Sequence, residues 1–131
     1  MRVEQDDRAA ADIIAGALGV VLSPPYVGLV VRDERGKVHG AAVVNDFTGA
    51  NAEVTVVGRC WTVRIVRDIS RYILHRLGCR RVTARTRASN AEAIHALEVL
   101  GFKREGVARE WFDGEDAIVF GLLASEQRIV R

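Results

Sequence analysis

Several residue types and sequence features are scarce in this chain, and their scarcity excludes some classes of function. It contains two cysteines, Cys60 and Cys79, and neither has a CxxC or Cys/His partner at metal spacing, so no metal site is predicted. One disulfide stays open, although nothing else in the sequence suggests export. The charged N-terminal segment lacks the apolar core of a signal peptide, and no apolar run is long enough to span a bilayer. We therefore expect a reduced, cytoplasmic protein.

A strong excess of one charge is also missing. The formal net charge is +2, which favours neither nucleic-acid nor membrane binding. With 49% hydrophobic and 27% charged residues, the 131-residue chain has the composition of one globular domain spanning residues 1–131. Arginines are nevertheless crowded between residues 59 and 87. They form either a solvated surface, which charge alone favours, or a positive surface near a phosphate-bearing ligand.

The spacing of apolar residues predicts an α/β fold. Helices are expected over residues 6–18, over 62–77, and after a cap at Ser89 or Asn90, with Gly19, Gly78 and Gly101 as their stops. Strands are expected over 26–32, 38–45, 52–57, 79–86, 102–111 and 117–123. This order, a helix and a hairpin followed by βαβαββ, implies a mixed sheet with helices on both faces. Residues 1–25 hold the N-terminal helix, and the polar tail over 124–131 is expected to be loosely held.

One junction has a chemical meaning beyond the fold. The strand over 52–57 runs through Gly58, Arg59, Cys60 and Trp61 into a helix that begins at Thr62. Helix N-termini expose unpaired N–H groups that suit a phosphate, and glycine allows close approach of a ligand. Arg59 and Arg64 are candidates for charge-assisted bonds to a pyrophosphate or a 3′-phosphate. Taken alone, such a junction is more often a tight turn.

A longer segment carries a resemblance to a known family. Residues 77–110 resemble the C-terminal half of the GNAT acetyltransferases, most closely ribosomal-protein N-terminal acetyltransferases and short phage-encoded relatives. The resemblance covers roughly residues 26–123, and residues 58–78 are similar to the family's cofactor loop and helix. The matching residues of the specific stretch are Asn90, Ala93, Gly101, Phe102, Glu105, Gly106 and Arg109.

The resemblance implies a GNAT-like fold and an acetyltransferase that takes acetyl-CoA as its co-substrate. The cofactor would enter between the strands over 52–57 and 79–86. Backbone groups of Thr55, Val56 and Val57 would pair with its pantetheine arm, and the pyrophosphate would bind N–H groups of Gly58, Arg59, Cys60, Trp61 and Thr62, with Arg64 nearby. The Asn90–Ala93 motif would also contact the cofactor, although a plain helix cap explains Asn90 equally well.

The implied reaction is attack of a neutral primary amine on a thioester, the amine coming from a protein N-terminus, a lysine or a small molecule. Glu53 is the candidate base, or else an exposed strand carboxylate; His39, His75 and His95 are weaker candidates. Trp61 and Trp111 would either line the acceptor cleft or pack in the core. The acidic turn over 113–116 would either favour a cationic amine or be merely solvated.

Two departures from the family keep alternatives open. Cys60 stands where the family's loop commonly has a second glycine, and Leu97 stands where many members have a tyrosine acid. A degenerate, non-catalytic module that binds CoA or a protein partner is therefore the first alternative. A nucleic-acid-associated protein is the second, but its arginine-rich stretch lacks interleaved aromatic residues. Only the family's habit suggests a homodimer.

Overall fold

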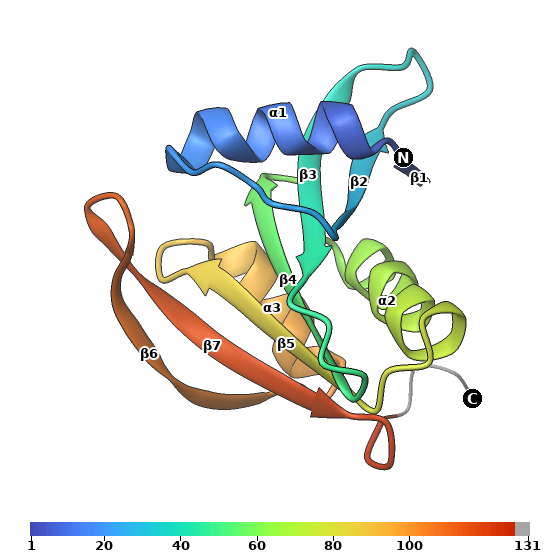
Figure 1. Cartoon of the computed structure of the whole chain (residues 1–131), viewed down its shortest axis with the longest axis vertical. Coiled ribbons are helices and arrows are strands. Elements are labelled where there is room, and N and C mark those ends of the chain that lie inside the picture. Colours follow the sequence, from blue (N-terminus) through green and yellow to red (C-terminus); the bar gives the residue numbers. More distant parts are fainter. Residues whose placement is uncertain (128–131) are drawn as a thin grey trace.

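The computed structural model describes residues 1–127 of the chain. A single seven-stranded sheet runs through this region in the order β1-β2-β3-β4-β5-β7-β6 (Figure 1). Its strands are β1 (Arg2–Gln5), β2 (Val27–Arg32), β3 (Val38–Asn45), β4 (Asn51–Gly58), β5 (Arg81–Arg87), β6 (Lys103–Phe112) and β7 (Glu115–Leu123). Neighbouring strands of the described chain are antiparallel except β4 and β5, which are parallel. The expected mixed α/β sheet is confirmed.

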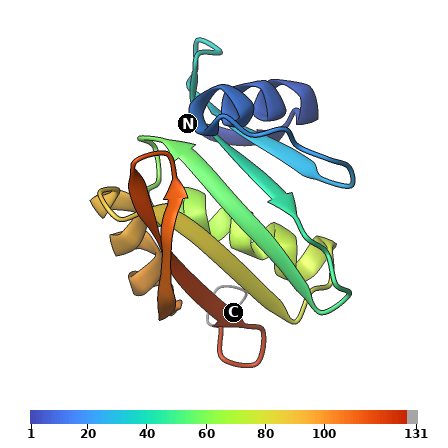
Figure 2. The ribbon, with the colours of Figure 1, turned by 60° about the vertical axis from the view of Figure 1, so that its left-hand side comes forward.

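The helices divide between the two faces of this sheet (Figures 1 and 2). Helix α1 (Asp7–Leu18) buries Ala10 and Ile14 against Val30, Ala41 and Val43 on one face. On the opposite face α2 (Val63–Arg71), the π-helical turn η1 (Tyr72–Arg76) and α3 (Ala91–Val99) cover the larger core. Alternate residues of a strand point to opposite faces of the sheet. Ala41 and Val43 of β3 therefore pack in the core under α1, and Ala42 and Val44 pack in the larger core on the other face.

Capping residues set the helix starts; the sequence predicts a cap at Asp6 or Asp7 and at Ser89 or Asn90, but takes Thr62 as the first residue of its helix. The side chains of Asp6, Thr62 and Asn90 each accept a hydrogen bond from the backbone N–H three residues later. Gly19 ends α1 with a φ of 67°. The helix expected over 62–77 is α-helical only to Arg71, and its last turn, η1, is π-helical.

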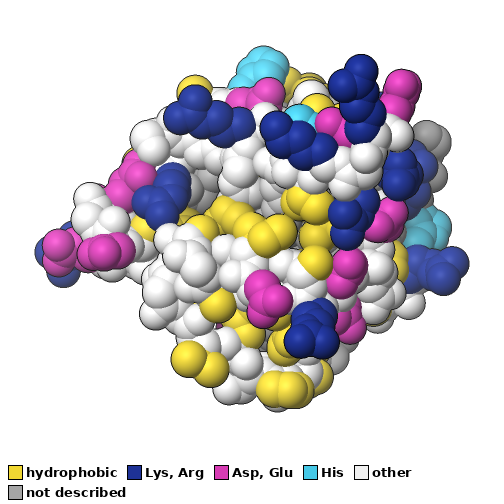
Figure 3. All heavy atoms as spheres, turned by 90° about the horizontal axis from the view of Figure 1, so that it is seen from above, with side chains coloured by type: hydrophobic (Ala, Val, Ile, Leu, Met, Phe, Trp, Pro, Cys, Tyr) yellow, Lys and Arg dark blue, Asp and Glu magenta, His cyan; other side chains and the backbone are white. Residues whose placement is uncertain are grey.

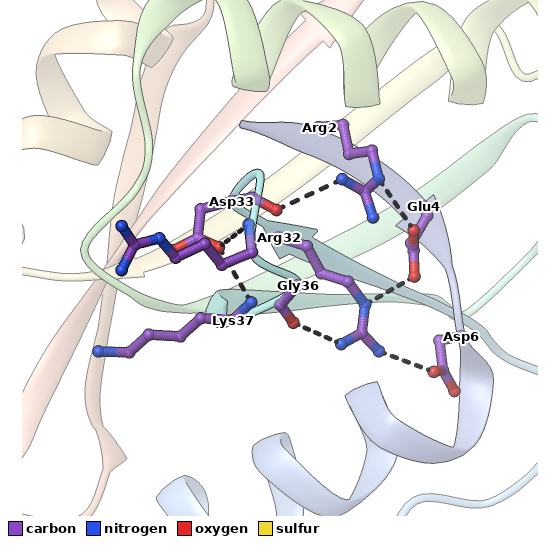
Figure 4. A network of polar contacts seen from close by, with 8 residues as sticks. Arg2, Glu4, Asp6, Arg32, Asp33, Gly36 and Lys37 are labelled. Carbon is purple, nitrogen blue, oxygen red and sulfur yellow. Dashed lines mark hydrogen bonds and ion pairs between the residues drawn. The ribbon is translucent and has the colours of Figure 1, made fainter.

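Strand β1 is absent from the sequence prediction, which opened with the helix. Its four residues pair antiparallel with β2, from Arg2 opposite Arg32 to Gln5 opposite Leu29. The Arg32 guanidinium holds this edge, since it donates to Glu4 at 2.6 Å and to Asp6 at 3.2 Å (Figure 4). The same side chain also reaches the Gly36 carbonyl at 3.0 Å. Four residues of mixed polarity give no periodic signal, so this strand depends on contacts distant in sequence.

Strand β5 begins later than expected. The sequence predicted a strand from Cys79, whereas pairing starts at Arg81, opposite Asn51 of β4. Cys79 is buried just before it, and the N–H groups of Arg80 and Arg81 both donate to the Ala50 carbonyl. The chain therefore turns at the end of the sheet before it extends alongside β4.

Candidate functional site

The parallel strands β4 and β5 separate before they end. They pair from Asn51 and Arg81 up to Thr55 and Arg85. Beyond this point β4 continues to Gly58 while pairing only with β3, and β5 continues to Arg87 while pairing only with β7. Two strands that stop pairing while both continue leave backbone groups facing a gap. In Figure 2 the two strands run side by side through the middle of the sheet.

A cavity of about 640 Å³ occupies this separation, and we call it the notch cavity. Its walls come from the end of β4, the end of β5, the first turn of α3 and the C-terminal part of α1. The lining residues are Ala17, Val56, Val57, Gly58, Arg59, Arg87, Ser89, Asn90, Ala91 and Glu92. Of the candidate cofactor residues, Val56, Val57, Gly58, Arg59 and Asn90 are therefore brought together here.

The loop between β4 and α2 is shaped by buried side chains. Trp61 is 0% exposed, and its indole N–H donates to the Gly58 carbonyl at 3.0 Å. Cys60 is also buried, and burial together with the nearby Glu92 carboxylate raises the pKa of its thiol to about 11. Trp61 therefore belongs to the core and does not line an acceptor cleft, and Cys60 has a structural, unreactive thiol.

Two N–H groups of this loop are already used by the protein itself. The Trp61 N–H donates to Oε1 of Glu92 at 2.6 Å, and the Thr62 N–H donates to the Cys60 carbonyl at 3.0 Å. Within the described part of the chain, the N–H groups of Arg59 and Cys60 have no acceptor. A carboxylate from α3 thus occupies a position where an anion would bind, a contact that the sequence analysis missed.

Cationic side chains flank the same cavity. Arg59 has no ion-pair partner among residues 1–127. Arg87 stacks 4.7 Å from the centroid of Phe112 and lies 3.3 Å from the Glu115 carboxylate, which also accepts the Ser89 N–H. One carboxylate of the acidic turn, that of Glu115, is therefore bound by two residues that line the notch cavity. Arg87 and Glu92 had no distinguishing local motif, although a glutamate in a helix's first turn is electrostatically favoured there.

Six candidates do not line the notch cavity: Cys60, Trp61 and Thr62 of the loop, and Ala93, Arg64 and Thr55. Ala93 is buried, and its N–H donates to the Asn90 side chain at 3.2 Å, so Asn90 is a helix cap as well as a cavity residue. Arg64 points elsewhere, toward the Met1 carbonyl at 2.6 Å and Asp68 at 3.6 Å. Thr55 is paired with Arg85 at the last closed step of the strands.

A second cavity, of about 300 Å³, lies farther back along β4, and we call it the Trp111 cavity. Glu53 and Thr55 of β4 line it, together with Trp111, the end of α1 and the loop over 20–22. Because Thr55 and Val56 are consecutive, the two cavities meet β4 where its pairing with β5 ends. Helix α1 likewise presents Ala17 to one cavity and Leu18 to the other.

Glu53 is held by an arginine in this second cavity. Its Oε2 accepts from Arg85 at 2.5 Å, and the Arg85 guanidinium stacks 4.7 Å from the centroid of Trp111. The Nε of Arg85 is buried without a hydrogen-bond partner among the described residues. Glu53 is therefore not an isolated exposed carboxylate, and Trp111 is held beside it by a cation–π contact.

The remaining candidates lie away from both cavities. His39 bonds the Asp33 carboxylate at 2.8 Å, and this contact lowers the pKa of Asp33 to about 2. His75 and His95 are exposed on the outer helices. Leu97 is buried in the core, so no acid is presented at its position.

Residues 1–127 contain neither a group of metal ligands nor a membrane-spanning helix. No group of three histidine, cysteine or acidic side chains is arranged to hold a metal ion there. No helix in this part of the chain is both long and apolar enough to cross a membrane.

Solved structures share this fold. A mutant form of the spermidine/spermine N-acetyltransferase SpeG from Vibrio cholerae superposes with a TM-score of 0.71 at 16% identity over 95% of both chains. Ribosomal-protein-S5-alanine acetyltransferase from Vibrio fischeri gives a TM-score of 0.63 at 21% identity, covering 77% of this chain and 63% of that one. No protein-family model and no curated protein matches the sequence. The chain therefore has the fold of the GNAT N-acetyltransferases, as its motifs predicted.

Proposed function

We propose that this protein is an N-acetyltransferase that moves the acetyl group of acetyl-CoA to a primary amine. The observation that carries the proposal is the separation of β4 and β5 beyond Thr55 and Arg85, which opens the notch cavity between two parallel strands. An extended chain can pair with exposed strand backbone in such a gap. The likeness to two N-acetyltransferases supports the same assignment through the fold alone.

The walls of the notch cavity fit a phosphate-bearing thioester. The unpaired N–H group of Arg59 and the guanidinium groups of Arg59 and Arg87 would hold the diphosphate. Val56 and Val57 would lie along the pantetheine arm, and Asn90 at the first turn of α3 would lie beside it. Glu92 opposes this fit, because its carboxylate already holds the Trp61 N–H and repels an anion.

The chemistry requires a neutral amine, which would approach from the Trp111 cavity. The thioester supplies the activated acetyl group. A new carbon–nitrogen bond forms, the carbon–sulfur bond breaks, and the proton lost by the amine passes to a base or to water. Glu53 is the proposed base, since it lies in the Trp111 cavity next to the last paired step of β4. Within residues 1–127 its Oε1 has no partner and is free to accept that proton.

A second candidate is a non-catalytic module that binds CoA. Two observations favour it: Glu92 occupies one loop N–H, and Leu97 is buried where a tyrosine acid would stand. The two candidates share the notch cavity and differ only in whether acetyl transfer occurs.

Calorimetric titration with CoA tests what both candidates share. Ala91 and His95 are both on α3, but only Ala91 lines the notch cavity. Ala91→Glu adds a carboxylate beside the proposed diphosphate position and is expected to weaken CoA binding at least about tenfold. His95→Glu, the matched control, is expected to leave it unchanged. Equal effects of the two variants, or no CoA binding by the unmodified chain, would refute the site.

Release of CoA thiol from acetyl-CoA in the presence of an amine then separates the two candidates. Burial raises the pKa of both cysteine thiols, so the folded protein contributes little background to a thiol reagent. Thiol release that depends on the amine establishes the transferase. CoA binding with no release under any amine establishes the non-catalytic module.

A further inference from the structure

From the lining of the Trp111 cavity we infer that the acceptor is a small primary amine carrying a single apolar group, not a polyamine. This inference rests on the proposed function, because it assigns the acceptor side of the same site. The cavity has about 300 Å³, which is at the small end of ligand pockets and suits a molecule of a few functional groups.

Most of the cavity wall is apolar. Ile14 and Leu18 of α1, Val20 to Leu22 of the following loop, Val43 of β3 and Trp111 of β6 all face it. Viewed from above, the molecule exposes hydrophobic side chains in the middle and at the lower margin of the face seen in Figure 3. Val21 is 93% exposed and Trp111 is 51% exposed, so this end of the wall has apolar area that a ligand would cover.

The acidic groups of the cavity are few and lie together. Glu53 and Asp46 are its carboxylates, and both adjoin Asn45, since Glu53 is paired with it across β3 and β4. Arg85 already neutralises part of the charge of Glu53 at 2.5 Å. What remains favours one ammonium or amine group near Glu53. A polyamine would place its other charged nitrogens against the valines and leucines, where a desolvated charge is costly.

The orientation of the amine follows from the two cavities. Thr55 is the last residue of β4 that pairs with β5, and the next residue, Val56, lines the notch cavity; Glu53 stands two residues before Thr55 and lines the Trp111 cavity with it. An amine held at Glu53 therefore lies nearest to the proposed thioester. Its apolar group would extend toward Trp111 and the loop over 20–22, away from the cofactor.

Amine binding can be measured without any cofactor. Phenethylamine is the probe for an amine with one apolar group, and spermidine is the probe for a polyamine. The chain has two tryptophans, so its nitrogen–proton NMR spectrum contains two indole signals, which Trp111→Phe assigns. Phenethylamine is expected to shift the Trp111 signal and to leave that of buried Trp61 in place. Spermidine is expected to bind at least about tenfold more weakly. Phenylpropanoate, which has a carboxylate in place of the amine, is expected not to bind.

A matched pair of variants tests the charge argument. Val21→Glu adds a third carboxylate to the cavity, at its exposed rim. Val99→Glu puts one on α3, where Val99 is 57% exposed and lines neither cavity. Val21→Glu is expected to strengthen spermidine binding relative to phenethylamine, and Val99→Glu to change neither.

The outcomes separate this inference from the proposed function. If CoA binds but phenethylamine leaves the Trp111 signal unmoved, or if spermidine binds more tightly to the unmodified chain, the acceptor assignment is wrong and the transferase proposal stands. If phenethylamine binds as expected but CoA does not, the apolar amine site stands and the transferase proposal fails.

Discussion

Gly58, where β4 turns into the notch loop, offers a sharp test of this geometry. Its φ is 102°, a conformation that other residues rarely adopt. A Cβ added there would lie 2.5 Å from the His39 carbonyl oxygen and 2.7 Å from the Gly40 Cα, both in the backbone of β3. No side-chain rotation relieves contacts with backbone atoms, so Gly58→Ala must move β3 or the loop.

The expected cost has two parts. The unfavourable backbone conformation costs about 1–3 kcal/mol. The overlap with β3 adds about 1–3 kcal/mol, as overpacking does in protein cores. The sum of about 2–6 kcal/mol is a large share of the roughly 5–15 kcal/mol that typically stabilises a domain. Gly58→Ala is therefore expected to unfold at a much lower urea concentration than the unmodified chain.

Gly101→Ala is the matched control. Gly101 has a φ of 94°, close to that of Gly58, but a Cβ there meets no atom within 4 Å. It carries the backbone cost without the overlap, so its free energy of unfolding should fall about 1–3 kcal/mol less than that of Gly58→Ala. Equal losses in urea unfolding of the two variants would show that β3 does not approach Gly58 as described.

Three further predictions concern charge and burial. Glu92→Gln removes a charge from the notch but keeps an oxygen for the Trp61 N–H, so calorimetry should show CoA binding about threefold to tenfold tighter; unchanged binding would contradict this. With its pKa raised to about 11, the Cys60 thiol should react with a thiol reagent at about pH 8 only after unfolding. Because folding lowers the pKa of Asp33 to about 2, the stability that it supplies with His39 should be present above about pH 4 and lost as the pH falls toward 2. Asp33→Asn should remove that loss in acid unfolding curves.

Predictions that rested on short-range signals agree with the structure. Asp6 and Asn90 cap helices because a side-chain oxygen three residues before a free N–H is a local geometry. The strand over 38–45 was predicted with its observed bounds, since a run rich in β-branched residues between turn residues needs no distant partner to be recognised. Strand β1 was missed because its pairing with β2 is what makes it a strand.

The candidate site was predictable along β4 but not across the sheet. Gly58 could be named from the strand and its following turn, and Val56 and Val57 from the family resemblance; all three line the notch cavity. Arg64 was placed beside the loop by sequence distance alone, yet the turn of α2 carries it to Met1. Arg87 and Glu92 follow another strand and helix, and nothing local to them indicates which loop they will face.

The sequence by itself determined the order of the elements from α1 onward and the apolar faces of its helices, because these follow from spacing and from neighbours a few residues away. Only the tertiary structure decided that β4 and β5 pair as far as Thr55 and Arg85 and no further. It also decided that a carboxylate of α3 bonds the Trp61 N–H. The physical reason is that register and separation of parallel strands depend on hydrogen bonds between residues about thirty positions apart, which no local pattern specifies.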